Sequence, residues 1–85
     1  MFTIKYSKKA LKIKVKMPRN ISRKIDTELE AIAANPKSYE GDWKRLKGSP
    51  FWRLRVGDWR VICEMAKKEL IIYILKIGER GDIYK

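Results

Sequence analysis

The hydrophobic pattern at the start of the chain predicts a short strand followed by a helix. Residues Phe2–Tyr6 alternate apolar and polar side chains, which is the period of a half-buried strand. Ser7 then suits the N-cap of a helix over Lys8–Met17. This segment also alternates with strand period, and as a helix it places Lys14 inside its apolar face. We favour the helix, because Pro18 suits a short turn into a second helix.

The second helix is marked by one narrow apolar stripe at helical spacing. Its members are Ile21, Ile25, Leu29 and Ile32. Asn20 is the predicted N-cap, and the helix ends before Pro36 because the residue that precedes a proline avoids the helical region. A single apolar stripe with charged residues around it is typical of a helix that lies on a sheet.

The pattern changes to period two in the second half of the chain. Phe51–Val56, Trp59–Met65 and Leu70–Ile77 read as strands, and Gly57-Asp58 reads as a tight turn between the first two. Trp43–Leu46 is either a strand or the edge of a loop. Leu70–Ile77 is apolar on both faces, which favours a central place in the sheet.

These elements predict a compact α+β domain over residues 1–85, with no internal boundary. Two N-terminal helices pack on an antiparallel, roughly four-stranded sheet in the order β-α-α-β-β-β, and the first strand joins the sheet. No apolar run approaches the roughly 20 residues of a spanning helix. The start, MFTIKYSKK, does not resemble a secretory signal, so we expect a cytoplasmic protein without a membrane partner.

The composition restricts the chemistry. Lysine and arginine number 21 against 10 acidic residues, and the formal charge of +11 favours a polyanionic partner such as nucleic acid, an acidic protein or an anionic membrane surface. There is no histidine, so any catalysis must use lysine, arginine, tyrosine or carboxylates. The single cysteine, Cys63, is expected in the core, and we predict neither a metal site nor a cofactor.

The arginines of the predicted strands supply the candidate chemistry. Alternation places Arg53 and Arg55 on one face, with Phe51, and the tight turn brings Arg60 beside them. Trp52 and Trp59 fall on the opposite, helix-facing side. The candidates outside this hairpin are Lys44, Arg45 and Lys47 before it, and Arg80 and Tyr84 after the last strand. A guanidinium matches phosphate oxygens in a bidentate manner, although charged strand residues also serve simply to keep an edge solvated.

Two stretches resemble the C-terminal half of RelE-type toxins: KRLKGSPFWRLRVGDWRVICEM and LIIYILKIGERGDIYK. The shared features are a leucine-glycine element, a basic strand, a glycine turn, an aromatic-arginine pair, and a final glycine-x-arginine followed by tyrosine. The N-terminal half fits the same plan, so the resemblance covers essentially the whole chain and is specific for the wider RelE/ParE group.

The resemblance implies a toxin of a type II toxin–antitoxin system that cleaves messenger RNA in the ribosomal A site, without a metal, by attack of a ribose 2′-hydroxyl on the adjacent phosphate. Arg60 and Arg80 would then hold the scissile phosphate, Arg53 and Arg55 the backbone and leaving side, and Tyr84 would act as base or orient the nucleophile. Lys44, Arg45, Lys47 and Phe51 would add RNA contacts. The implied partners are an acidic antitoxin and the ribosome with its message.

Some positions depart from the family pattern. Several members carry lysines where Arg53 and Arg55 stand, and arginine is a poor proton donor, which favours electrostatic positioning over general-acid catalysis. Many members carry a histidine where this chain has Glu79, and relatives often have an apolar residue where Lys14 stands. Two alternatives remain open: a ParE-like inhibitor of DNA gyrase without nuclease activity, and an inactive relative that binds only its antitoxin.

Overall fold

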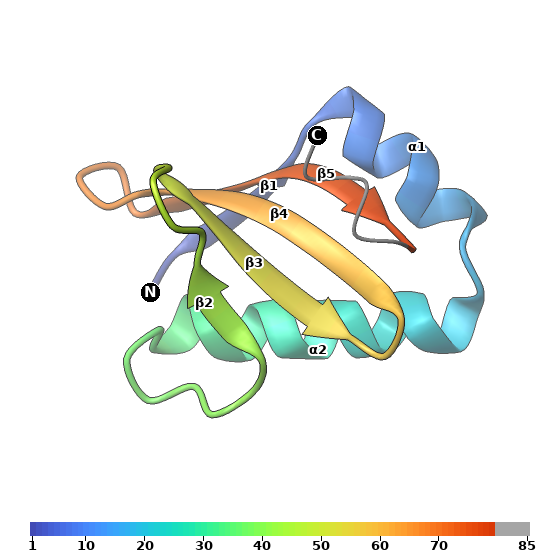
Figure 1. Cartoon of the computed structure of the whole chain (residues 1–85), viewed down its shortest axis with the longest axis horizontal. Helices are drawn as coiled ribbons and strands as arrows, with labels where there is room; N and C mark the ends of the chain where they lie inside the picture. Colours follow the sequence, from blue (N-terminus) through green and yellow to red (C-terminus); the bar gives the residue numbers. More distant parts are fainter. Residues whose placement is uncertain (80–85) are drawn as a thin grey trace.

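The computed structural model describes residues 1–79 as two helices and one sheet (Figure 1). The elements in chain order are β1 (Thr3–Tyr6), α1 (Lys8–Lys16), α2 (Arg19–Ala34), β2 (Trp43–Arg45), β3 (Phe51–Val56), β4 (Trp59–Ala66) and β5 (Ile71–Gly78). The predicted α+β class is therefore confirmed, and the order of elements matches the predicted β-α-α-β-β-β with one additional strand. The helix over the ambiguous first segment is confirmed as well.

The sheet differs from the prediction in two respects. It has five strands in the order β1-β5-β4-β3-β2, since the short segment β2 pairs with β3. The pairing of β1 with β5 is parallel, so the sheet is mixed rather than antiparallel. β5 is hydrogen-bonded to β1 on one side and β4 on the other, and this interior position explains its apolar composition.

The two helices begin in different ways. In α1 the Ser7 hydroxyl accepts a hydrogen bond from the Ala10 amide at 3.0 Å, as the N-cap prediction required. In α2 the prediction of Asn20 as N-cap is wrong. Pro18 occupies the N-cap position without a side-chain bond, and its carbonyl accepts from the Ser22 amide at 2.9 Å. The extended backbone at Pro18 lets the helix start directly after it, and Asn20 lies inside the first turn.

Both helices pack on the same face of the sheet. The core joins buried side chains of α2, such as Ile25 and Leu29, to strand residues such as Leu54, Val61 and Ile74. In Figure 1, α2 runs behind the strands and α1 lies beside β5. The core residues of β3 and β4 alternate along their strands as the period-two pattern predicted, whereas in β5 the alternation of Ile72 and Ile74 is broken before Ile77. Cys63 is fully buried among them, and burial raises the pKa of its thiol above the ordinary value.

Trp52 and Trp59 lie on the helix side of the sheet, as predicted, and Trp43 lies there as well. Trp59 is half-buried and packs against the core. Trp52 pairs in register with Cys63 and stacks on Trp43, with ring centroids 5.0 Å apart and an angle of 17° between the planes. The stack lies beside the core rather than inside it, because Trp52 is not one of the residues that pack against the buried cluster.

Candidate nucleic-acid interface on the open face of the sheet

The face of the sheet opposite α2, here called the open face, carries the candidate residues. Strand register places Arg53 opposite Ile62 and Arg55 opposite Arg60, and directly paired residues project to the same side. Ile62 is only 5% exposed yet does not belong to the helix-side core. Its cover on the open face comes instead from neighbouring long side chains, since its partners in register are Arg53 and Lys76.

Arg55 and Arg60 form a pair of adjacent cations on this face. They are direct partners across β3 and β4, at the strand ends joined by the Gly57-Asp58 turn. Arg55 Nε donates to the Gly57 carbonyl at 3.4 Å, and Arg60 Nη1 donates to the Asp58 and Glu79 carbonyls at 3.4 and 3.5 Å. These long bonds aim the guanidinium groups without neutralising them, and two like charges in direct register favour an anion between them.

Arg53 is held in a different environment. Its side chain is 13% exposed and forms an ion pair with Asp42 through Nη2, while its Nε is buried without an acceptor among the described residues. The Asp42 carbonyl accepts from the Arg55 amide at 2.9 Å, so the same residue fixes the backbone next to the cationic pair. Part of the Arg53 charge is thereby compensated, and the guanidinium has a fixed place beside Ile62.

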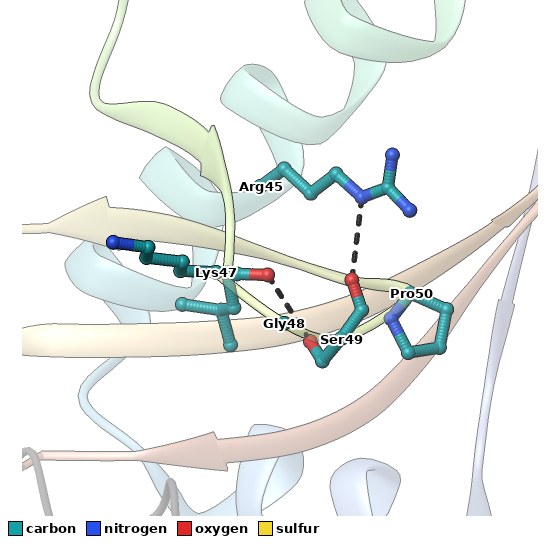
Figure 2. A pocket seen from close by; sticks show the side chains of 6 residues that line it. Arg45, Lys47, Gly48, Ser49 and Pro50 are labelled. Carbon is teal, nitrogen blue, oxygen red and sulfur yellow. Dashed lines mark hydrogen bonds between the residues drawn. The ribbon is translucent and has the colours of Figure 1, made fainter.

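The basic run before β3 divides between two surfaces. Lys44 pairs in register with Arg53 and is exposed on the open face. Arg45 pairs with Trp52 and so belongs to the helix side, where its Nε donates to the Ser49 carbonyl at 3.2 Å. Figure 2 shows its guanidinium and the Lys47 ammonium extending in different directions. They border a shallow depression of about 620 Å³ at the hairpin, away from the paired arginines.

Phe51 completes the predicted set on the open face. It is half-buried and pairs with Glu64 of β4, two positions along the strand from Arg53. Arg80 and Tyr84 lie outside the described residues, and their proposed roles remain predictions. Sequence reasoning missed Tyr73, which pairs with Glu64 on the open face. An aromatic residue in the alternation of LIIYILKI was the available signal.

Lys76 is a second open-face residue that sequence reasoning missed. Strict alternation places it on the same side as Ile72 and Ile74, which are buried in the core. An irregularity between β4 and β5 inserts Leu75 between the partners of Ile62 and Cys63, so that Lys76 pairs with Ile62. The bulge thus brings one more cation to the row that runs from Lys44 through Arg53.

Residues 1–79 lack two features, a spanning helix and a cluster of metal ligands. No helix in this part of the chain is long and apolar enough to cross a membrane. No group of three or more histidine, cysteine, aspartate or glutamate residues there could hold a metal ion. The open face presents guanidinium and ammonium groups arranged by strand register, with the Glu64 carboxylate and the rings of Phe51 and Tyr73 on the same face.

Known proteins share both the sequence and the fold. A family model described as the ParE toxin of the type II toxin–antitoxin system parDE matches residues 4–84. The RelE1 protein of Methanocaldococcus jannaschii is 35% identical over 86 residues, which covers 99% of this chain and 96% of the relative. The crystal structure of the archaeal RelE–RelB complex from Pyrococcus horikoshii OT3 contains a chain that is 28% identical, with a TM-score of 0.80 and coverage of 94% of this chain and 96% of that one.

A more distant structure agrees in fold. The intact RelBE toxin–antitoxin complex of E. coli matches with a TM-score of 0.81 at 13% identity, over 95% of this chain and 99% of that one. The architecture is thus that of the RelE toxins. The chain belongs to the ParE toxin family of type II toxin–antitoxin systems, and its similarity to RelE proteins makes it a RelE-type toxin of the RelE/ParE superfamily.

Proposed function

We propose that this toxin is a ribosome-dependent endoribonuclease that cleaves messenger RNA in the A site. The observation that carries the proposal is the direct pairing of Arg55 and Arg60 on a sheet face that neither helix covers. The similarity to RelE1 and to the archaeal RelE chain supports the RelE branch of the family over the gyrase-directed branch. Two adjacent guanidinium groups suit the two negative oxygens of a phosphodiester.

The proposed reaction is an internal transfer of the phosphate. The ribose 2′-oxygen attacks the adjacent phosphorus, the bond to the 5′-oxygen breaks, and the products are a 2′,3′-cyclic phosphate and a 5′-hydroxyl. Arg60, with Arg80 from the tail, stabilises the charge that builds on the phosphate oxygens, and Arg55 lies on the leaving side. Tyr84 removes the 2′-proton or orients the hydroxyl. A guanidinium is a poor proton donor, so a water molecule supplies the proton that converts the departing 5′-oxygen into the 5′-hydroxyl.

Arg53 has a positioning role in this proposal. Its ion pair with Asp42 holds the β2–β3 edge, and the Asp42 carbonyl bonds the Arg55 amide. Lys44 and Lys76, in the same row, add charge for the RNA backbone on either side of the scissile phosphate. Phe51 offers a ring face to an unstacked base.

The partner that restrains the toxin is, in this proposal, a cognate antitoxin. The related archaeal and E. coli RelE chains were solved in complexes with RelB. The charge of +11 on this chain suits an acidic partner, and their association should be fast and sensitive to salt.

The test is primer extension on a defined message in a reconstituted translation system. The purified toxin should cut inside A-site codons only when ribosomes are present, and Arg60→Ala should slow cleavage about 100-fold, the usual scale for loss of a transition-state hydrogen-bond donor. Arg23→Ala is the matched control, since Arg23 is exposed on α2 rather than on the open face. It should cut at the wild-type rate.

The competing function is inhibition of DNA gyrase. It is retained as an alternative because the matching family is named after the ParE toxin. A gyrase supercoiling assay with the same preparations separates the two. Intact message with inhibited supercoiling would assign the chain to the gyrase-directed branch, and intact message with normal supercoiling but retained antitoxin binding would indicate an inactive relative.

A further inference from the structure

A second candidate surface lies on the helix side of the sheet, near the end of α2. It is a largely apolar pocket of about 560 Å³, here called the tryptophan pocket. Its apolar lining consists of Phe2, Pro36, Trp43, Trp52, Met65 and Leu70. Asn35, Lys37 and Lys67 also line it and are exposed. Because the strand register places Trp52 and Arg55 on opposite faces, the pocket is separate from the cationic pair and does not depend on the proposed nuclease function.

Trp43, which lines this pocket, carries a hydrogen-bond donor that is not used within the described part of the chain. Its Nε1 is buried and has no acceptor among residues 1–79, while the ring stacks on Trp52. Buried indole N–H groups normally have an acceptor, because a donor removed from water and left unpaired is unfavourable. An occupant of the pocket that carries a carbonyl could accept this hydrogen bond after a small turn of the Trp43 ring.

Leu70 is an independent sign of function at the same place. The φ of Leu70 is 56°, in the left-handed region that a leucine rarely adopts, and Leu70 is 48% exposed. The conformation is fixed on both sides: its amide donates to the Lys67 carbonyl at 3.3 Å, and its carbonyl accepts from the Thr3 amide at 2.7 Å. A large apolar side chain is thus held toward solvent at the edge of a pocket by a strained backbone, and such strain is concentrated at binding sites.

The chemistry of the pocket selects its ligand. A nucleobase presents several polar edge groups, and this apolar lining would leave most of them unpaired. An aliphatic or aromatic side chain needs no such partners, and the peptide that carries it supplies the one carbonyl that Trp43 requires. Lys37 and Lys67, together with the +11 charge of the chain, favour acidic residues on either side of that side chain.

We propose that the tryptophan pocket binds an acidic peptide segment of a partner protein, which inserts one large apolar side chain beside Trp43, Trp52 and Leu70. The segment is extended, and a backbone carbonyl next to the inserted side chain accepts the hydrogen bond of Trp43 Nε1. Carboxylates that flank the inserted side chain pair with Lys37 and Lys67.

The test follows the three indole N–H resonances of the ¹⁵N-labelled full chain during titration with acetyl-Asp-Glu-Leu-Glu-Asp-amide. Single Trp→Phe variants assign the resonances. We expect the Trp43 signal to move furthest, Trp52 to move less, and Trp59 to stay in place. Replacing the peptide's leucine by alanine should weaken binding about tenfold, because most of the buried apolar area is lost.

Matched leucine variants separate specific binding in the tryptophan pocket from non-specific hydrophobic binding of the peptide. Leu70→Gly suits the left-handed backbone and removes the exposed side chain, so the protein stays folded and should bind the peptide several-fold more weakly. Leu11→Ala is the control, because Leu11 is equally exposed at 48% but lies on α1. The proposal is overturned if the Trp43 signal does not move at millimolar peptide, if the alanine peptide binds equally well, or if Leu11→Ala weakens binding as much as Leu70→Gly. It is also overturned if a short uridine oligonucleotide moves the same signals at lower concentration.

Discussion

The ion pair between α1 and α2 allows a quantitative test of how this small core tolerates charge. Lys14 falls inside the apolar face of α1, and its side chain is only 11% exposed. Its ammonium lies 2.9 Å from Asp26 Oδ1 and 2.5 Å from the Ser22 hydroxyl, and 5.9 Å from the centre of the Tyr6 ring. The Tyr6 hydroxyl in turn donates to Asp26 at 3.2 Å. The buried Lys14 ammonium thus has one carboxylate partner, Asp26, and two weaker partners, the Ser22 hydroxyl and the Tyr6 ring.

The two halves of this pair should respond unequally to mutation. Asp26→Asn keeps the shape and an acceptor for Tyr6 but leaves the Lys14 charge unpaired. A fully buried pair would lose about 3–5 kcal/mol and an exposed one less than about 1 kcal/mol. Asp26 is 48% exposed, so we expect a loss of about 2 kcal/mol. Lys14→Met removes the buried charge and fills the same space, and should change stability by less than about 1 kcal/mol.

Urea denaturation of both single variants and the double variant measures the difference. If the unpaired cation is the source of the loss, Lys14→Met should rescue Asp26→Asn by at least about 1 kcal/mol, because the double variant contains no buried charge. The reasoning fails if the two single variants lose equal stability and their effects add in the double variant.

Three further outcomes follow from other parts of the fold. Leu70→Gly should raise the free energy of unfolding by about 1 kcal/mol, measured by urea denaturation, because glycine adopts the left-handed backbone without strain. Cys63 should react with a thiol reagent only after unfolding, since it is fully buried and its thiol pKa is raised; fast labelling of the native protein would contradict this. Stability should fall as pH rises past about 10, because burial and the neighbouring carboxylates raise the pKa of Tyr6 and Tyr39 above that of unfolded tyrosine and favour their protonated forms; a flat profile in alkaline melts would count against it.

The sequence predicted those parts of the fold that depend on local signals. The Ser7 cap and Pro18 marked the two ends of α1, and the Gly57-Asp58 turn between two alternating runs specified the β3–β4 hairpin. The parallel pairing of β1 with β5 joins segments almost seventy positions apart, and no local pattern encodes it. β2 has three residues, too few for a periodic pattern to distinguish it from a loop.

The residues of the candidate site also divide into those that local sequence signals predicted and those that they did not. Arg55 and Arg60 could be paired from the sequence because a tight turn fixes the register of its strands. Lys76 could not, since the bulge at Leu75 moves it to the opposite face from the one that alternation predicts. The ion pair of Arg53 with Asp42 also escaped, because Asp42 precedes a strand that the pattern did not establish. Contacts that depend on an irregular strand or on an edge strand were therefore beyond prediction.

The central claim, cleavage by 2′-hydroxyl attack on the open face, is tested most directly by one substrate. Ribosomes are programmed with a message that carries a single 2′-deoxynucleotide immediately 5′ of the phosphate that is cut in the A site. The account predicts that the unmodified message yields a 2′,3′-cyclic phosphate and a 5′-hydroxyl, that the deoxy message stays intact, and that Arg60→Ala slows the first reaction about 100-fold. Cleavage of the deoxy message at the same phosphate, or wild-type cleavage by Arg60→Ala, would contradict it.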